Sequence, residues 1–381
     1  MDILHYTEKH NQFRERLRSF LAKEVTPFAD EWEHNKIVPK SAWRKMGQEG
    51  FLCYMLKPEY GGIGGDFLYS IIVSEEMVRT GQAGLTATLH SDIIVPYIDS
   101  YGTEEIKQKY LPKCASGDII TAVAMTEPDA GSDLANIQST AVEDSDYVVI
   151  NGNKTFISNG INCDLVIVAA RDPEIPNPYE SLSLYIVEDG TPGFNKGQKL
   201  NKMGMNSQDT AEMFFNNCKV PVTNRLGEKG QGFILLMQKL QQERLVCSIG
   251  AVVVAEYVIE YLMDFCKTNT DINGKPLSKY QATQFKLIEM LTEVKLGKTF
   301  MEKLVADHME NKNIVVETSM CKYWTTDLIK RMAYDAIDII GLPAMNDDHP
   351  ITRMWRDVRI MSIFAGTNEI MKGIAAKFLG L

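Results

Sequence analysis

Residues 233–267 read FILLMQKLQQERLVCSIGAVVVAEYVIEYLMDFCK. Apolar side chains recur at every third or fourth position along this stretch, and no proline interrupts it. This spacing places the apolar side chains on one side of an α-helix. The segment therefore predicts one long amphipathic helix.

Three more helices are expected downstream of this segment. Residues 281–310 and 317–341 repeat the same apolar spacing, and a further helical stretch begins at Ile351. Long amphipathic helices joined by short connections are typical of antiparallel bundles. Residues 229–381 are therefore predicted to form a C-terminal four-helix bundle.

The pattern upstream of the long helix is different. Between residues 118 and 225, short segments rich in β-branched residues alternate with turn residues. The pair Asn151-Gly152 separates two such segments, and this dipeptide is a strong signal for a hairpin turn. Residues 118–228 are therefore predicted to form an all-β middle domain, a barrel or sandwich.

The chain before residue 118 is predicted to be helical again. The stretch from His10 to Glu33 has helical spacing interrupted at Pro27, and a glycine-rich turn follows at residues 60–65. Helical segments are expected again near residues 70–81 and 84–102. The predicted fold class is mainly α with a central β domain: residues 1–117 helical, then the β domain, then the bundle.

The composition limits the possible functions. The chain has 381 residues with a net charge of −10, which argues against binding to a phosphate backbone. No apolar run reaches the roughly 18–20 residues of a membrane helix, and the N-terminus resembles neither a signal nor a transit peptide. We therefore expect a cytoplasmic protein with no membrane or nucleic-acid partner.

Some classes of binding site are not supported by the residues. The seven cysteines form no CxxC pair and the six histidines no HxxxH spacing, so no metal site is expected. No GxGxxG or GxxxxGK[ST] motif occurs, so a nucleotide cofactor would have to bind in another geometry.

Four segments together resemble the acyl-CoA dehydrogenase family, in the family's order and over nearly the whole chain. They are Glu59–Asp66 (EYGGIGGD), Ala124–Asp133 (AMTEPDAGSD), Lys154–Gly160 (KTFISNG) and Ala365–Glu369 (AGTNE). The resemblance implies FAD as cofactor and an acyl-CoA substrate that is desaturated between Cα and Cβ. It also implies an electron-transferring flavoprotein as electron acceptor and a homotetramer built as a dimer of dimers.

This reaction makes three physical demands on the protein. A carboxylate must remove the weakly acidic α-proton of the thioester. Hydrogen-bond donors must wait where negative charge develops on the thioester oxygen. The β-hydrogen leaves as hydride to the flavin N5, which is the cofactor's own chemistry.

The resemblance assigns cofactor contacts to two segments of the β domain. Residues Val123 to Ser132 would line the FAD, with Met125 and Thr126 nearest the ring and Ser132 touching the acyl-CoA as well. A polar loop that closes a strand is the alternative. The second segment is Phe156-Ile157-Ser158. Its aromatic side chain can stack on the flavin ring, and its hydroxyl can reach a flavin heteroatom. The alternative is an ordinary buried strand. The remaining cofactor residues implied are Phe156, Ile157, Ser158, Gln281, Thr367, Asn368 and Glu369.

The catalytic base is predicted to be Glu243. Many family members carry the base directly before the Gly-Thr of the last motif, but Ala365 stands there and can offer only its backbone N–H. The long-chain and isovaleryl branches instead use a glutamate before an arginine on the first bundle helix, which matches Glu243-Arg244. The alternative is a helix glutamate in a salt bridge. The substrate-binding residues implied are Ser132, Gln241, Gln242, Arg244, Ala365 and Gly366.

Asp92 is a second candidate acid. It lies in an apolar segment, residues 89–95, that borders the acyl pocket in this family. A buried carboxylate is costly without a partner or a function. One interpretation is an aspartate hydrogen-bonded to His90, Ser91 or the backbone. The other is a polar acyl pocket, in which Asp92 binds or deprotonates an unusual acyl group, such as an alicyclic one.

The sequence departs from the family at the adenosine end of the cofactor. Thr270 replaces an arginine, and residues 338–344 (DIIGLPA) retain one of the usual three glycines. A lost charge-assisted contact to phosphate costs about 1.5–3 kcal/mol when nothing replaces it. Two rival functions are kept: another flavin-linked step of the same fold, such as enoyl-CoA reduction, and a non-catalytic CoA-binding scaffold.

Overall fold

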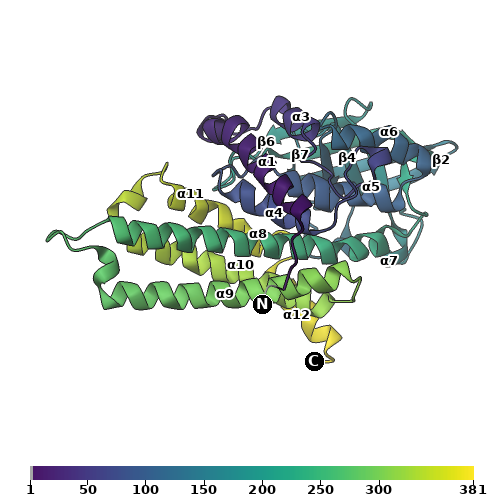
Figure 1. Ribbon diagram of the computed structural model, residues 1–381. Coiled ribbons are helices and arrows are strands. Elements are labelled where there is room, and N and C mark those ends of the chain that lie inside the picture. Colours follow the sequence, from purple (N-terminus) through teal and green to yellow (C-terminus); the bar gives the residue numbers. More distant parts are fainter. Residues whose placement is uncertain (1–2) are drawn as a thin grey trace.

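The computed structural model describes residues 3–381 and divides into a helical region, a β-sheet and a second helical region (Figure 1). The mainly α fold class with a central β domain is therefore confirmed. The predicted boundary at residue 117 lies between α6 and β1, and that at residue 228 lies between β8 and α8.

The N-terminal region consists of short helices packed around one apolar core. Pro27 sits in a 3-10 turn, Thr26–Phe28, that separates the first two α-helices, as its position in the sequence predicts. Gly61 and Gly64 adopt positive φ values of 87° and 62° in the predicted glycine turn. The helices are α1 (Glu8–Glu24), α2 (Ala29–Asn35), α3 (Lys40–Gln48), α4 (Leu68–Val78), the π-helical turn η3 (Leu89–Ile94), α5 (Val95–Tyr101) and α6 (Glu104–Ala115).

The middle region is an eight-stranded sheet with the order β6-β7-β3-β2-β4-β5-β8, and β1 pairs in parallel with β4. Strand β4 is buried along almost its whole length, because it lies inside the sheet and is covered on both faces. The strands are β1 (Thr121–Ala124), β2 (Thr140–Asp144), β3 (Tyr147–Ser158), β4 (Leu165–Arg171), β5 (Leu182–Glu188), β6 (Phe194–Lys199), β7 (Thr210–Pro221) and β8 (Arg225–Leu226). A short helix, α7 (Pro178–Ser181), precedes β5.

The hairpin turn predicted at Asn151-Gly152 is wrong. Strand β3 runs straight through this pair, with a register shift against β7 between Ile150 and Gly152. A Cβ on Gly152 would lie 2.2 Å from the Ser139 hydroxyl oxygen, so glycine is needed there for close approach. The turn between β2 and β3 lies earlier, at Ser145, whose φ is 57°.

The C-terminal region contains three long helices, α8 (Gly232–Thr268), α9 (Gln281–Met309) and α10 (Val315–Ile340). The single fourth helix predicted from Ile351 is wrong. That stretch is divided into α11 (Pro350–Asp357), a 3-10 turn (Val358–Ser362) and α12 (Asn368–Phe378). The break holds the start of the AGTNE segment, where Ala365 and Gly366 have positive φ values that no α-helix tolerates.

Helix α8 joins the regions. Its apolar residues Leu245, Ile249 and Val252 pack with Leu68 and Ile71 of α4. Of the described residues, α8 is the one helix long and apolar enough to cross a membrane, but 67% of its apolar window is buried inside the protein. A core helix passes the same test.

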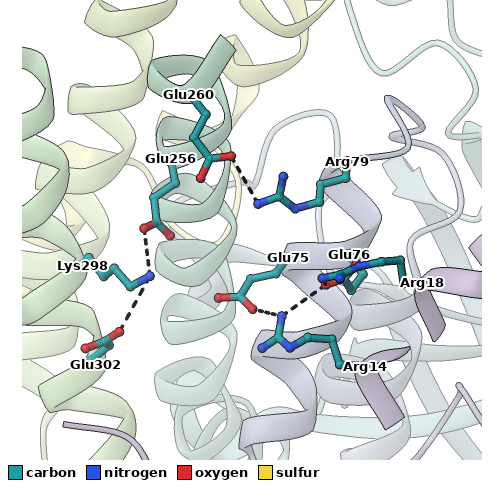
Figure 2. A network of polar contacts seen from close by, with 9 residues as sticks. All are labelled: Arg14, Arg18, Glu75, Glu76, Arg79, Glu256, Glu260, Lys298 and Glu302. Carbon is teal, nitrogen blue, oxygen red and sulfur yellow. Dashed lines mark hydrogen bonds and ion pairs between the residues drawn. The ribbon is translucent and has the colours of Figure 1, made fainter. Parts of the chain in front are cut away.

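Ion pairs flank this apolar contact. Figure 2 shows Arg14 and Arg18 of α1 reaching Glu75 and Glu76 of α4, while Arg79 pairs with Glu260 of α8. On the other side of α8, Glu256 accepts a 2.8 Å contact from Lys298 of α9. The network therefore links the N-terminal helices to the bundle through α8.

Candidate active site

Glu243 lies on α8, close to the π-helical turn η3. Its Oε2 is buried and has no hydrogen-bond partner among residues 3–381. Burial raises the pKa of the carboxyl to about 7, although Arg244 and Lys322 lower it. A carboxyl with this pKa is half deprotonated near neutral pH, which suits a general base.

Arg244 does not compensate Glu243 with a salt bridge. The described residues form no ion pair with either side chain, so the salt-bridge alternative is wrong. Arg244 is only 6% exposed, its Nε lacks a partner, and burial lowers its pKa. An unpaired buried guanidinium is costly, so it indicates a position prepared for an anionic or carbonyl-bearing ligand.

Asp92 is buried in η3 and is only 1% exposed. Its Oδ2 accepts hydrogen bonds from the Tyr54 hydroxyl at 2.7 Å and the Ser70 hydroxyl at 2.6 Å, while Oδ1 has no partner in the described chain. Burial raises the pKa of Asp92 to about 7. The carboxyl is therefore half satisfied, with one oxygen left over.

The partners first expected for Asp92 are wrong. The two ring nitrogens of His90 contact the Thr121 hydroxyl and the Cys114 carbonyl, and the Ser91 hydroxyl accepts from the Cys53 N–H. Both side chains are thus used elsewhere, because a π-helical turn distributes its residues around the axis differently from an α-helix.

Two features near Asp92 were not expected from the sequence. Gln242 Nε2 donates to the Asp92 carbonyl at 2.6 Å, which ties the helix of Glu243 to the π-helical turn. Tyr97 is fully buried, and its hydroxyl has no partner within residues 3–381. Burial raises the pKa of Tyr97, and the charge of Glu243 raises it further. Buried tyrosine hydroxyls usually find a partner, so Tyr97 joins Glu243 and Asp92 as an unsatisfied polar group.

The AMTEPDAGSD loop is fixed by a buried ion pair. Glu127 accepts from Lys154 Nζ at 2.7 Å and from two backbone N–H groups, at Gln138 and Ser139. Lys154 also donates to the Met125 carbonyl at 3.1 Å, and burial lowers its pKa to about 8. These contacts hold Met125 against strand β3, and the Glu127–Lys154 ion pair was not predicted from the sequence.

The surface beside this loop suits a flat ring system. Phe156 has a φ of 57° in an irregular part of β3 and remains 68% exposed, a conformation that costs about 1–2 kcal/mol for a non-glycine residue. Such an exposed aromatic side chain, held in a strained conformation, fits stacking against a flavin. The predicted neighbours Val123, Met125, Thr126 and Ser158 are half-buried, and Ser132 is exposed.

Ile157 differs from these residues. Its side chain is 3% exposed and belongs to the apolar core of the sheet. Only its backbone can therefore reach a cofactor, because alternate residues of a strand face opposite sides.

The first three residues of the AGTNE segment, Ala365 to Thr367, form the turn before α12. Ala365 and Gly366 have φ values of 55° and 88°, and no described residue hydrogen-bonds to their N–H groups. The Thr367 hydroxyl accepts from Ile370 N–H and caps α12, and Glu369 is exposed. The turn thus offers two backbone donors, as the thioester oxygen would require.

Asn368 is placed differently from the sequence prediction. Its side chain is 3% exposed, so it faces the protein interior. The amide oxygen accepts from Lys322 and Thr326, and the amide nitrogen donates to the Tyr323 carbonyl. Its side chain therefore holds α12 against α10 and is not free to bind a cofactor.

Gln281 is not brought to the other predicted cofactor residues. It begins α9, at the end of the bundle that lies away from the β-sheet (Figure 1). Thr270 and Asp338, where the sequence departs from the family, belong to the same end of the bundle.

Three protein-family models match the chain and together cover most of it. The acyl-CoA dehydrogenase N-terminal domain matches residues 7–118, the middle domain residues 122–218 and the C-terminal domain residues 230–380. The order of the three matches is the order of the helical, β and helical regions of the structure.

Individual proteins are similar over nearly the full chain. The rat long-chain specific acyl-CoA dehydrogenase of mitochondria is 38% identical over 98% of this chain and 86% of its own length. The crystal structure of an acyl-CoA dehydrogenase from Geobacillus kaustophilus superimposes with a TM-score of 0.97, at 49% identity over 99% of each chain. A 3-(aryl)acrylate reductase from Clostridium sporogenes is 32% identical over 98% of this chain and 99% of its own.

Proposed function

The chain belongs to the acyl-CoA dehydrogenase family of FAD-dependent oxidoreductases, and we propose that it desaturates an acyl-CoA thioester between Cα and Cβ with Glu243 as the base. The observation that carries this proposal is the buried, unpartnered Oε2 of Glu243, whose carboxyl has a pKa of about 7. A carboxylate in this state is available to take a proton at neutral pH.

The surrounding residues supply the remaining requirements. When bound, FAD accepts the β-hydrogen as hydride. Ala365 and Gly366 offer backbone N–H groups to the thioester oxygen as negative charge develops there. Arg244 adds a buried positive charge beside the base, which favours its deprotonated form.

Asp92 gives the acyl pocket a polar element. Its free Oδ1, the unpartnered Tyr97 hydroxyl and Glu243 all lie around the contact of η3, α5 and α8. We propose that Asp92 binds a polar group on the acyl chain or deprotonates a carbon beyond Cα, as an alicyclic acyl group would require. An Asp92→Asn variant with an unchanged order of substrate preference would exclude this role.

Enoyl-CoA reduction is the second candidate. The same base and cofactor serve both directions of the reaction, and the similarity to the 3-(aryl)acrylate reductase supports this alternative. The direction is decided by measuring flavin reduction by saturated acyl-CoAs against oxidation of the reduced enzyme by the matching enoyl-CoAs.

We also propose a homotetramer and an electron-transferring flavoprotein as electron acceptor. Phe285, Ile288 and Leu296 are each about 60% exposed along one side of α9, an apolar surface that a second copy would cover. A neighbouring copy would also bring Gln281 and its end of the bundle to a cofactor site. Light scattering tests the tetramer, and reduction of the purified flavoprotein tests the acceptor.

A substrate panel tests the central proposal. The FAD-loaded protein is mixed anaerobically with straight, branched, aromatic and alicyclic acyl-CoAs, and bleaching of the flavin absorbance near about 450 nm is followed. Bleaching by at least one saturated acyl-CoA is expected. A protein that takes up no FAD, or whose flavin reacts with no acyl- or enoyl-CoA, would instead favour a CoA-binding scaffold.

A further inference from the structure

Lys322 is an unusual residue because it is a fully buried lysine without a carboxylate partner in the described chain. It lies in the middle of α10 and is 0% exposed. Its Nζ donates to the Gly366 carbonyl at 2.6 Å and to the Asn368 amide oxygen at 3.2 Å. Burying an ammonium group is costly, so these two contacts must matter for the structure or its function.

The two acceptors of Lys322 lie in and directly after the turn that carries the free backbone donors, at Gly366 and Asn368. Ala365 and Gly366 both adopt positive φ, a conformation that is strained for the alanine and that its surroundings must stabilise. Asn368 is held in turn by Thr326 and by the Tyr323 carbonyl. One turn of α10 thus fixes the C-terminal side of the strained segment.

Lys322 also lies close to the proposed base. Its charge lowers the pKa of Glu243, and Glu243 and Arg244 in turn act on the pKa of Lys322. Arg244 from its own helix and Lys322 from α10 act on the charge of Glu243, and Glu243 in turn acts on Tyr97 of α5 and Cys247 of α8. Lys322 is the one among them that also hydrogen-bonds the 365–368 turn.

We propose that Lys322 is a positioning residue that fixes the Ala365-Gly366 donors and places its charge beside Glu243. The inference rests on the proposed function of Glu243 and these donors. Lys322 touches no reacting atom itself. It acts by holding the backbone N–H groups where the thioester oxygen gains charge and by favouring the deprotonated base.

The test compares four variants of the FAD-loaded protein. Lys322→Met removes both the charge and the hydrogen bonds, Lys322→Arg keeps the charge, and Asn368→Ala loosens the turn but keeps the charge. Lys330→Met removes an exposed lysine of the same helix and serves as the control. Folding and FAD content are checked by melting temperature and visible absorbance.

The variants should separate the two effects of Lys322. For Lys322→Met, the rate of flavin reduction should fall on the order of ten- to a hundredfold. This decrease is no larger than the one expected from removing a hydrogen-bond donor to the thioester oxygen itself. The Kd for acyl-CoA should change little. Its pH–rate profile should move to higher pH, because the base loses a stabilising positive charge. Lys322→Arg should keep the wild-type pH profile, Asn368→Ala should lose rate without a pH shift, and Lys330→Met should match the wild type.

A folded Lys322→Met protein with the wild-type rate and pH profile would overturn the inference. If that variant does not fold, wild-type rates in both Lys322→Arg and Asn368→Ala, with unchanged amide hydrogen exchange at residues 363–368, would overturn it. Failure of the proposed function looks different, since no acyl-CoA would then reduce the wild-type flavin. In that case hydrogen exchange of the turn and an infrared pH titration of the Glu243 carboxyl, with Glu243→Gln as reference, decide about Lys322 without turnover.

Discussion

The glutamates of helix α8 differ in whether their carboxylates have partners. Glu256 and Glu260 lie in the charged network of Figure 2, where Lys298 and Arg79 pair with them. Glu243, nearer the start of the same helix, has a buried oxygen without a partner in the described chain. Glu256 and Glu260 join α8 to its neighbours, whereas burying the Glu243 carboxylate without a hydrogen bond to Oε2 is destabilising.

This difference indicates where selection acted for stability and where it acted for chemistry. The same network includes Glu76, which is only 2% exposed yet accepts hydrogen bonds from both Arg14 and Arg18. A buried carboxylate can thus be satisfied in this protein where structure alone requires it. Glu243, Asp92 and Tyr97 each have one buried oxygen without a hydrogen-bond partner in the described chain. This grouping indicates that the region around η3 is the reactive one.

The largest expected effect comes from replacing Glu243. Glu243→Gln keeps the size of the side chain but removes the base, so flavin reduction by the best acyl-CoA should slow about 10²–10⁴-fold. The rate is measured by anaerobic stopped-flow absorbance. The matched control is Glu256→Gln on the same helix, which should reduce at close to the wild-type rate. Equal rates in the wild type and Glu243→Gln would remove Glu243 from the mechanism.

A smaller effect, on stability alone, is expected from Glu76. Glu76→Gln leaves Arg14 and Arg18 without their shared charged acceptor, which should destabilise the protein by about 1–3 kcal/mol. Thermal unfolding of the FAD-loaded protein measures this, and the reduction rate of the folded enzyme should stay the same. Glu260→Gln breaks an exposed pair and should cost at most about 1 kcal/mol. A larger loss for Glu260→Gln than for Glu76→Gln would contradict the comparison.

The fold was largely predictable because the spacing of apolar residues along the sequence indicates helices and strands directly. The helical regions, the β region and the family followed from apolar spacing and four motifs. The errors came where a dipeptide or a segment is compatible with two different local structures. Asn151-Gly152 can form a turn, but here Gly152 lets the backbone pass Ser139. The helical pattern after Ile351 gave no sign that Ala365 and Gly366 would break it.

The site was predictable only where a motif named its residues. Glu243 was singled out because Ala365 leaves the alternative position without an acid, and its catalytic role stays a prediction. The partners of Asp92 lie 38 and 22 residues away in sequence, at Tyr54 and Ser70, and no local pattern connects them. Lys322 was missed for the same reason, since its contacts with the 366–368 turn are 44 and 46 residues distant.

The smallest expected effect is an opposite pH dependence of stability at Glu243 and Glu76. The pKa of Glu243 is raised from 4.5 to about 7, so the folded state favours its protonated form. The wild type therefore loses stability as the pH rises through this window, and Glu243→Gln should gain melting temperature relative to it by pH 8 but not at pH 4.

The pKa of Glu76 is lowered by Arg18 and Arg14 against the effect of burial, so its contribution to stability is present at neutral pH and lost in acid. The melting-temperature deficit of Glu76→Gln should accordingly shrink as the pH falls below about 4.5, the ordinary pKa of a glutamate. Parallel pH curves for the two variants would mean that both carboxylates are equally well satisfied, and the distinction between a structural and a reactive glutamate would fail.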